Sequence, residues 1–71
     1  MGGKKYLYRG HVVFVGSLYE LPVETFRTYW MDNDGGFHCV NVKGLPPRKT
    51  RITAQKDLDR WANVRELKEA M

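Results

Sequence analysis

The chain has 71 residues, of which 42% are hydrophobic, and a formal net charge of +4 at pH 7. This length allows one domain with a small core, and a single cysteine excludes an internal disulfide. The sequence shows no secretory signal, no apolar run long enough to span a membrane and no zinc-binding pattern, so we expect a cytoplasmic protein without membrane contact, metal or cofactor.

Residues 1–5 are expected to form a flexible N-terminus, followed by a single domain over residues 6–71. Val, Tyr and Phe are frequent between residues 6 and 19, which predicts a strand there. Gly10 and Gly16 interrupt this run, so a bulge or bend and then a turn are expected within it. The strand should end at Leu21-Pro22, because proline cannot donate a hydrogen bond to a central ladder.

A β-hairpin is predicted next, with strands over residues 25–31 and 37–42. The loop between them, Asp32–Gly36, consists of residues that tolerate positive φ. This loop sets the cross-strand pairs Trp30–His38, Thr28–Val40 and Phe26–Val42. The register keeps one face of the hairpin mostly apolar, so that face should meet the core.

The segment from Lys43 to Arg51 contains four basic residues and no acidic one, and its two prolines favour an extended loop. A short edge strand is expected over residues 51–53, and a helix over about residues 54–69 with Thr53 as its N-cap. The apolar stripe of this helix changes side after residue 62. The helix therefore either breaks near Asn63 or continues and presents a second apolar strip to something else.

Together these elements predict an α+β fold, in which one C-terminal helix packs on one face of a three- to four-stranded antiparallel sheet. A sheet curled like a small barrel is one version of this fold. The predicted core consists of Val13 or Phe14, Phe26, Trp30, Val40, Val42, Ile52, Leu58 and Trp61.

No catalytic or metal site is indicated. His38 and Cys39 are neighbours in a predicted strand, so their side chains should point to opposite faces and cannot act as a pair. The run Asp32–Gly35 looks like the start of a calcium loop, but Gly36 and Lys43 stand where that loop needs oxygen donors. We therefore expect a non-enzymatic protein without a small-molecule substrate.

Two binding hypotheses remain. The first is a small accessory protein that binds a partner protein or a second copy through Val64, Leu67 and Met71, which lie off the main helical stripe. The alternative is a nucleic-acid-binding module that uses the outward sheet face and the basic loop. Its candidate contacts are Arg27, Tyr29, Asn41, Lys43, Arg48, Lys49 and Arg51.

The distribution of charge bears on this choice. Residues 43–71 hold eight basic and four acidic residues, so the whole positive excess lies there. Such an excess either marks a nucleic-acid contact or only keeps a small protein soluble.

Overall fold

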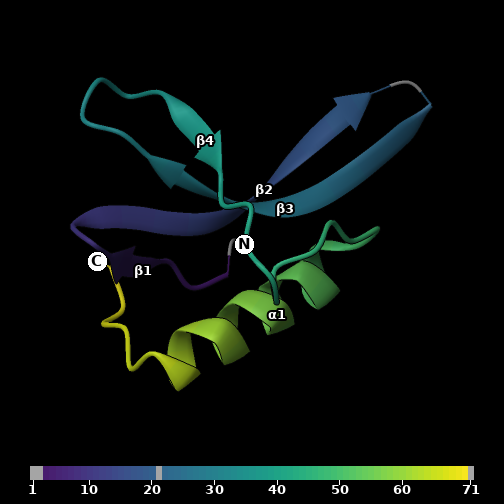
Figure 1. The fold of residues 1–71 in the computed structure, drawn as a ribbon. Helices are drawn as coiled ribbons and strands as arrows, with labels where there is room; N and C mark the ends of the chain where they lie inside the picture. Colours follow the sequence, from purple (N-terminus) through teal and green to yellow (C-terminus); the bar gives the residue numbers. More distant parts are fainter. Residues whose placement is uncertain (1–2, 21, 71) are drawn as a thin grey trace.

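The computed structural model describes residues 3–20 and 22–70 and shows an antiparallel sheet with one C-terminal helix, which confirms the α+β class (Figure 1). The sheet has four strands in the order β1-β2-β3-β4, so each strand pairs with its neighbours along the chain. The elements are β1 (Tyr6–Tyr8), β2 (His11–Glu20), β3 (Val23–Met31), β4 (Phe37–Cys39) and α1 (Arg51–Val64). Isolated bridges at Glu69 and Arg48 pair further segments with β1 and β3, so the sheet extends beyond its four strands.

Residues 6–19 form two strands, β1 and β2, which confirms the interruption expected at Gly10. A bulge or bend within one strand is wrong, because the chain reverses there. Arg9 and Gly10 lie between these strands with φ of 53° and 81°, the left-handed conformation that a two-residue hairpin turn requires. The turn expected at Gly16 is also wrong, since Gly16 lies within β2 and pairs with Arg27 of β3. β2 ends at Glu20 as Leu21-Pro22 predicted, although Leu21 itself lies outside the described residues.

The predicted hairpin between β3 and β4 is confirmed, including the pairing of Trp30 with His38. Asp32 holds the loop because its Oδ1 accepts hydrogen bonds from the backbone N–H groups of Asp34 (2.9 Å) and Gly36 (2.8 Å). The His38 ring lies 2.6 Å from Asp32 Oδ2. This contact, and then the two backbone donors, lower the pKa of the Asp32 carboxyl.

The hairpin is shorter than predicted at its open end. β4 stops at Cys39, although the Val40 N–H still donates to the Thr28 carbonyl at 2.9 Å. The expected pair Phe26–Val42 does not form, because the backbone of Arg48 exchanges two hydrogen bonds with that of Phe26, at 2.7 and 2.9 Å. The chain between them leaves the sheet and returns, which buries Leu45 in the core.

The helix begins one turn earlier than predicted, so the edge strand over residues 51–53 and the N-cap at Thr53 are both wrong. Thr50 is the N-cap, and its side chain accepts a hydrogen bond from the Thr53 N–H at 3.3 Å. This bond satisfies one of the N–H groups that a helix start leaves open.

The helix ends at Val64, which confirms the break near Asn63 and contradicts continuation to residue 69. Glu66 adopts a φ of 54°, and the Leu67 N–H donates to the Ala62 carbonyl at 3.0 Å. The chain then runs beside β1, where the Leu7 N–H donates to the Lys68 carbonyl (2.9 Å).

The core lies between α1 and the sheet. It confirms four predicted residues as buried, namely Val13, Val40, Leu58 and Trp61, while Phe26 and Trp30 are partly buried against them. The predictions for Val42 and Ile52 are wrong, because their side chains are 43% and 68% exposed. The prediction missed Tyr6, Val15 and Leu45, while Ala54 and Ala62 are buried with Leu58 and Trp61 in the apolar stripe of the helix.

The N-terminal segment is tied to the helix and to the final residues. Gln55 Nε2 donates to the Lys4 carbonyl (3.0 Å), and the Ala70 N–H donates to the Lys5 carbonyl (2.7 Å). The flexible N-terminus expected over residues 1–5 stays a prediction, and residues 1–2 lie outside the described residues. Among those described, no helix has the length and apolar character needed to cross a membrane.

Candidate functional site

One face of the sheet is not covered by the helix. Tyr6, Val13, Val15 and Thr28 are buried on the side of α1, so the alternating residues of each strand face away from it. Figure 1 shows α1 along one side of the sheet only. We call the uncovered side the open face; its residues are Leu7, Val12, Phe14, Gly16, Leu18, Val23, Thr25, Arg27, Tyr29, Met31, Phe37 and Cys39.

An aromatic cluster occupies the middle of the open face. The ring centroids of Phe14 and Phe37 are 5.4 Å apart in an edge-on arrangement, and those of Phe14 and Tyr29 are 6.3 Å apart. An open hollow of about 270 Å³ lies beside these rings. Phe37 is 62% exposed although it is a large apolar side chain, so the cluster presents ring surface to solvent.

Gly16 lets the Tyr29 ring lie against the sheet. A Cβ atom at this position would stand 3.0 and 3.1 Å from Cδ2 and Cε2 of Tyr29. Glycine inside a strand often marks such a close approach. The interruption that the sequence shows at Gly16 is therefore explained by packing on the open face and not by a turn.

Two cationic side chains accompany the rings. Lys5 Nζ lies 5.8 Å from the centroid of the Phe14 ring, and Arg27 is opposite Gly16 on the neighbouring strand. Arg27 Nε is buried without a hydrogen-bond partner, and within the described chain neither cation forms an ion pair. No described Asp or Glu side chain lies at a strand position of the open face. Within the described part of the face, the charged side chains that accompany the rings are therefore both cations.

The structure separates the candidate nucleic-acid contacts that the sequence grouped together. Only Arg27 and Tyr29 lie on the open face. Asn41 and Lys43 line separate cavities, and Lys49 is exposed in the loop before the helix. The other two, Arg48 and Arg51, are held by contacts within the fold.

Arg48 binds the helix. Its Nε and Nη2 donate to the Asp57 carboxylate at 2.6 and 3.2 Å, and these contacts raise the pKa of Arg48. Arg51 lies over the Phe26 ring at 5.2 Å and donates to the Val15 carbonyl at 3.2 Å. Both guanidinium groups therefore serve the packing of α1 on the sheet.

Replacing Arg48 with alanine is expected to lower the thermal unfolding midpoint by several degrees and by more than Asp57→Asn does. Asp57 is only 6% exposed, so Arg48→Ala leaves a buried carboxylate without its charged partner. Asparagine at position 57 keeps the shape and an acceptor oxygen. Circular dichroism melts of both variants and of the double variant Arg48→Ala/Asp57→Asn measure this difference. The double variant should be more stable than Arg48→Ala, and equal midpoints for all three would contradict the argument.

The candidate protein-contact strip does not form as one surface. Val64 is 73% exposed at the end of α1, whereas Leu67 is partly buried against the core. Met71 lies outside the described residues. The turn after Val64 thus directs Leu67 inward, away from the surface that Val64 occupies.

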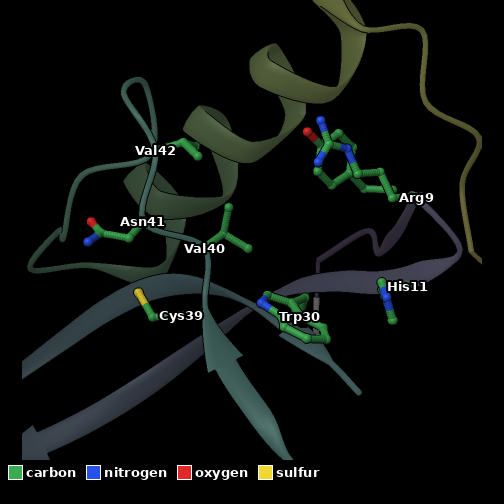
Figure 2. Close-up of a pocket in the computed structure, with 8 residues that line it drawn as sticks. Arg9, His11, Trp30, Cys39, Val40, Asn41 and Val42 are labelled. Carbon is green, nitrogen blue, oxygen red and sulfur yellow. The ribbon is translucent and has the colours of Figure 1, made fainter. Parts of the chain in front are cut away.

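A second hollow, of about 370 Å³, lies on the helix side of the sheet between the β1–β2 turn and the segment that leaves β4. Figure 2 shows Arg9 across this cavity from Asn41, with Trp30 between them. The Trp30 ring has His11 at 4.6 Å and His38 stacked at 4.5 Å. The Trp30 ring is therefore packed against two other rings of the fold. The Arg9 guanidinium lies over the Tyr8 ring, 5.2 Å from its centroid.

The described residues assemble no group of three His, Cys, Asp or Glu side chains that would hold a metal ion. Cys39 is a free, half-buried thiol that lies two residues after Phe37 on β4. Cys39 pairs with Tyr29 and also lines the cavity beside Trp30. The ring of His38, which lies between Phe37 and Cys39, is engaged by Trp30 and Asp32.

Sequence reasoning did not include Lys5, Phe14, Gly16 or Phe37 among the candidate contacts. The turn at Arg9-Gly10 was expected only as a bulge or bend, because arginine is not typical of the left-handed conformation that Arg9 adopts. With that turn, strand alternation puts Lys5 and Leu7 on the same side as Phe14. No protein-family model matches the chain, and no curated protein or solved structure is significantly similar to it.

Proposed function

We propose that the protein is a non-enzymatic, nucleic-acid-binding module that acts through its open face. One observation carries this proposal: the rings of Phe14 and Phe37 share a face with Lys5 and Arg27, which have no carboxylate partner within the described chain. Cationic side chains neutralise phosphates, and aromatic rings stack on bases. The proposal includes a cytoplasmic location, where the free Cys39 thiol would remain reduced.

The proposed surface differs from the one that the sequence favoured. The basic loop contributes less, because Arg48 and Arg51 are engaged inside the fold. The open face instead supplies Lys5 and Arg27, which form no ion pair within the described chain. The formal net charge of +4 favours the approach of a polyanion to the molecule as a whole.

The test is fluorescence anisotropy with a labelled oligonucleotide at several salt concentrations. Affinity should fall as salt rises, with a log–log slope of about −0.7 to −0.9 for each phosphate neutralised. The double variant Lys5→Glu/Arg27→Glu should lose measurable binding. The control Lys49→Glu/Lys56→Glu makes the same change in net charge at exposed residues away from the open face and should retain most of the affinity.

Two results would overturn the proposal. One is the absence of binding below about 10⁻⁴ M, the level of weak non-specific association. The other is equal loss in the two charge-reversed variants, which would show that net charge and not the open face attracts the oligonucleotide.

Self-association or partner binding through the same face is the second candidate. Leu7, Leu18, Met31 and Phe37 are each between 37% and 62% exposed on this side of the sheet. Exposed apolar patches mark protein interfaces, so the protein-contact hypothesis moves from the helix strip to the open face. Sedimentation should then show a dimer that Leu18→Glu dissociates and that salt leaves intact, whereas a monomer at all concentrations contradicts self-association.

A further inference from the structure

We propose that the open face binds single-stranded nucleic acid in preference to a duplex, with bases stacked on Phe14 and Phe37. This inference rests on the proposed function and specifies its ligand. It follows from which chemical groups the open face presents and which groups the fold places elsewhere.

The first reason is the kind of surface that is exposed. Phe37 is 62% exposed, and the neighbouring Phe14 meets it edge-on at 5.4 Å, so ring surface is available to a planar ligand. In a duplex each base is stacked between its neighbours and presents only its edges in the grooves. A single strand can offer whole base faces, which are the surfaces that aromatic side chains stack on.

The second reason is the position of the polar side chains that read base edges. Duplex recognition in the major groove relies on Arg, Asn and Gln, which form paired hydrogen bonds with bases. Among the described open-face positions only Arg27 is of this kind. Asn41 lines the cavity on the helix side, and Gln55 donates to Lys4 and Asp59. Among its described side chains, the open face therefore lacks a set of groups that could hydrogen-bond to base edges.

The third reason is the placement of the cations around the rings. Lys5 lies beside Phe14 at the β1 edge, and Arg27 on β3 is two pairs further along the sheet than Tyr29. The apolar residue Leu18 lies beyond Arg27, and Met31 lies at the opposite end of the face, paired with Phe37. A single-stranded nucleic acid whose bases contact the rings can place its phosphates near Lys5 and Arg27. Binding to the phosphate backbone of a duplex would require a broader charged surface. The expected binding is therefore tolerant of sequence.

The experiment compares one labelled oligonucleotide as a single strand and as a duplex with its complement, at equal salt, in DNA and RNA versions. The single strand should bind at least about tenfold more tightly. Phe37→Ala should weaken single-strand binding by about five- to 150-fold, the range for loss of one base–aromatic stack. The matched control is Ile52→Ala, since Ile52 is 68% exposed on the helix and should not affect binding.

Gly16→Ala provides a second variant that leaves charge and ring number unchanged. The added Cβ would stand 3.0 Å from the Tyr29 ring, so the ring must move. We expect a several-fold loss of single-strand affinity and the same weak duplex binding as in the parent protein. If single-stranded DNA and RNA bind with different affinities, the comparison identifies the preferred one. A preference for either single strand over its duplex supports the inference.

The outcomes separate this inference from the proposed function. Equal or tighter duplex binding, or single-strand binding that ignores Phe37→Ala, overturns the inference and leaves nucleic-acid binding in place. Absence of binding to both forms overturns the proposed function itself. A circular dichroism melt of each variant confirms that any loss of affinity occurs in a folded protein.

Discussion

Replacing Trp61 with alanine is expected to destabilise the protein by about 3–5 kcal/mol, the usual cost of removing a large buried aromatic side chain. Trp61 is only 5% exposed, and its ring contacts Tyr8 edge-on at a centroid distance of 4.9 Å. The Arg65 guanidinium lies over the same ring at 4.3 Å, and Gly44 packs close to its edge. One side chain thus joins the helix to β1 and to the loop after β4.

The effect should be large for this chain in particular, because small domains have little stability in reserve. A loss of about 3 kcal/mol corresponds to a fall of at least about 12 °C in the unfolding midpoint of a domain this size. Circular dichroism melts and urea titrations measure the change. Ile52→Ala is the matched control on the same helix, and its 68% exposure predicts a change within about 0.5 kcal/mol. A Trp61→Ala protein with the parent's midpoint would contradict the role of this ring.

Trp61→Phe refines the same prediction. The Trp61 Nε1–H group is buried without a hydrogen-bond partner among the described residues. Phenylalanine removes that unsatisfied donor while keeping an aromatic ring. Trp61→Phe should therefore lower the free energy of unfolding by clearly less than Trp61→Ala does. The comparison separates the stability gained by packing the ring from the stability lost by burying its unsatisfied N–H group.

The features that could be predicted from sequence are those decided locally. The loop Asp32–Gly36 contains residues that tolerate turns, and the Asp32 side chain closes it through its own backbone neighbours. That turn fixes Trp30 opposite His38. The stripe of Leu58, Trp61 and Ala62 likewise appears at helical spacing, and all three are buried.

The features that could not be predicted depend on contacts between distant residues. Arg48 pairs with Phe26 and Asp57, and these contacts hold the loop that was expected to bind phosphate. Residues 68–70 lie beside β1, although their sequence suits a helix as well as an extended chain. No local pattern specifies such pairings, because each depends on where the rest of the chain has already been placed.

Only part of the candidate site could be predicted from the sequence, for the same reason. Alternation within the predicted hairpin placed Arg27 and Tyr29 on the outward face correctly. Lys5 precedes β1 and Phe14 lies on β2, so their contact depends on the turn at Arg9-Gly10. The bulge or bend expected at Gly10 is a full reversal of the chain, so the sequence did not place Lys5 beside Phe14.

Tyr6 should lower the stability by up to about 2–3 kcal/mol as the pH rises from about 10 to about 12. The Tyr6 hydroxyl donates to Asp59 Oδ1 at 2.6 Å, and its side chain is 9% exposed. Burial first, then the hydrogen bond and the negative charges of Asp59 and Glu69, raise the pKa of Tyr6 to about 12. The unfolded phenol ionises near its ordinary pKa of 10.0, so above that pH the unfolded state gains the stabilisation of an ionised tyrosine while the folded state still keeps the proton.

Urea titrations across this pH range test the prediction when parent, Tyr6→Phe and Tyr19→Phe proteins are compared. Tyr6→Phe cannot ionise at that position, so the fall in its stability should be smaller than the parent's by the same amount. The variant also leaves Asp59 with the hydrogen bond from Gln55 at 2.9 Å, so its carboxylate is not orphaned. Tyr19 is 57% exposed, and its replacement should leave the parent's pH dependence unchanged. If Tyr6→Phe loses as much stability as the parent between these pH values, the alkaline transition belongs to other groups and the buried phenol does not control it.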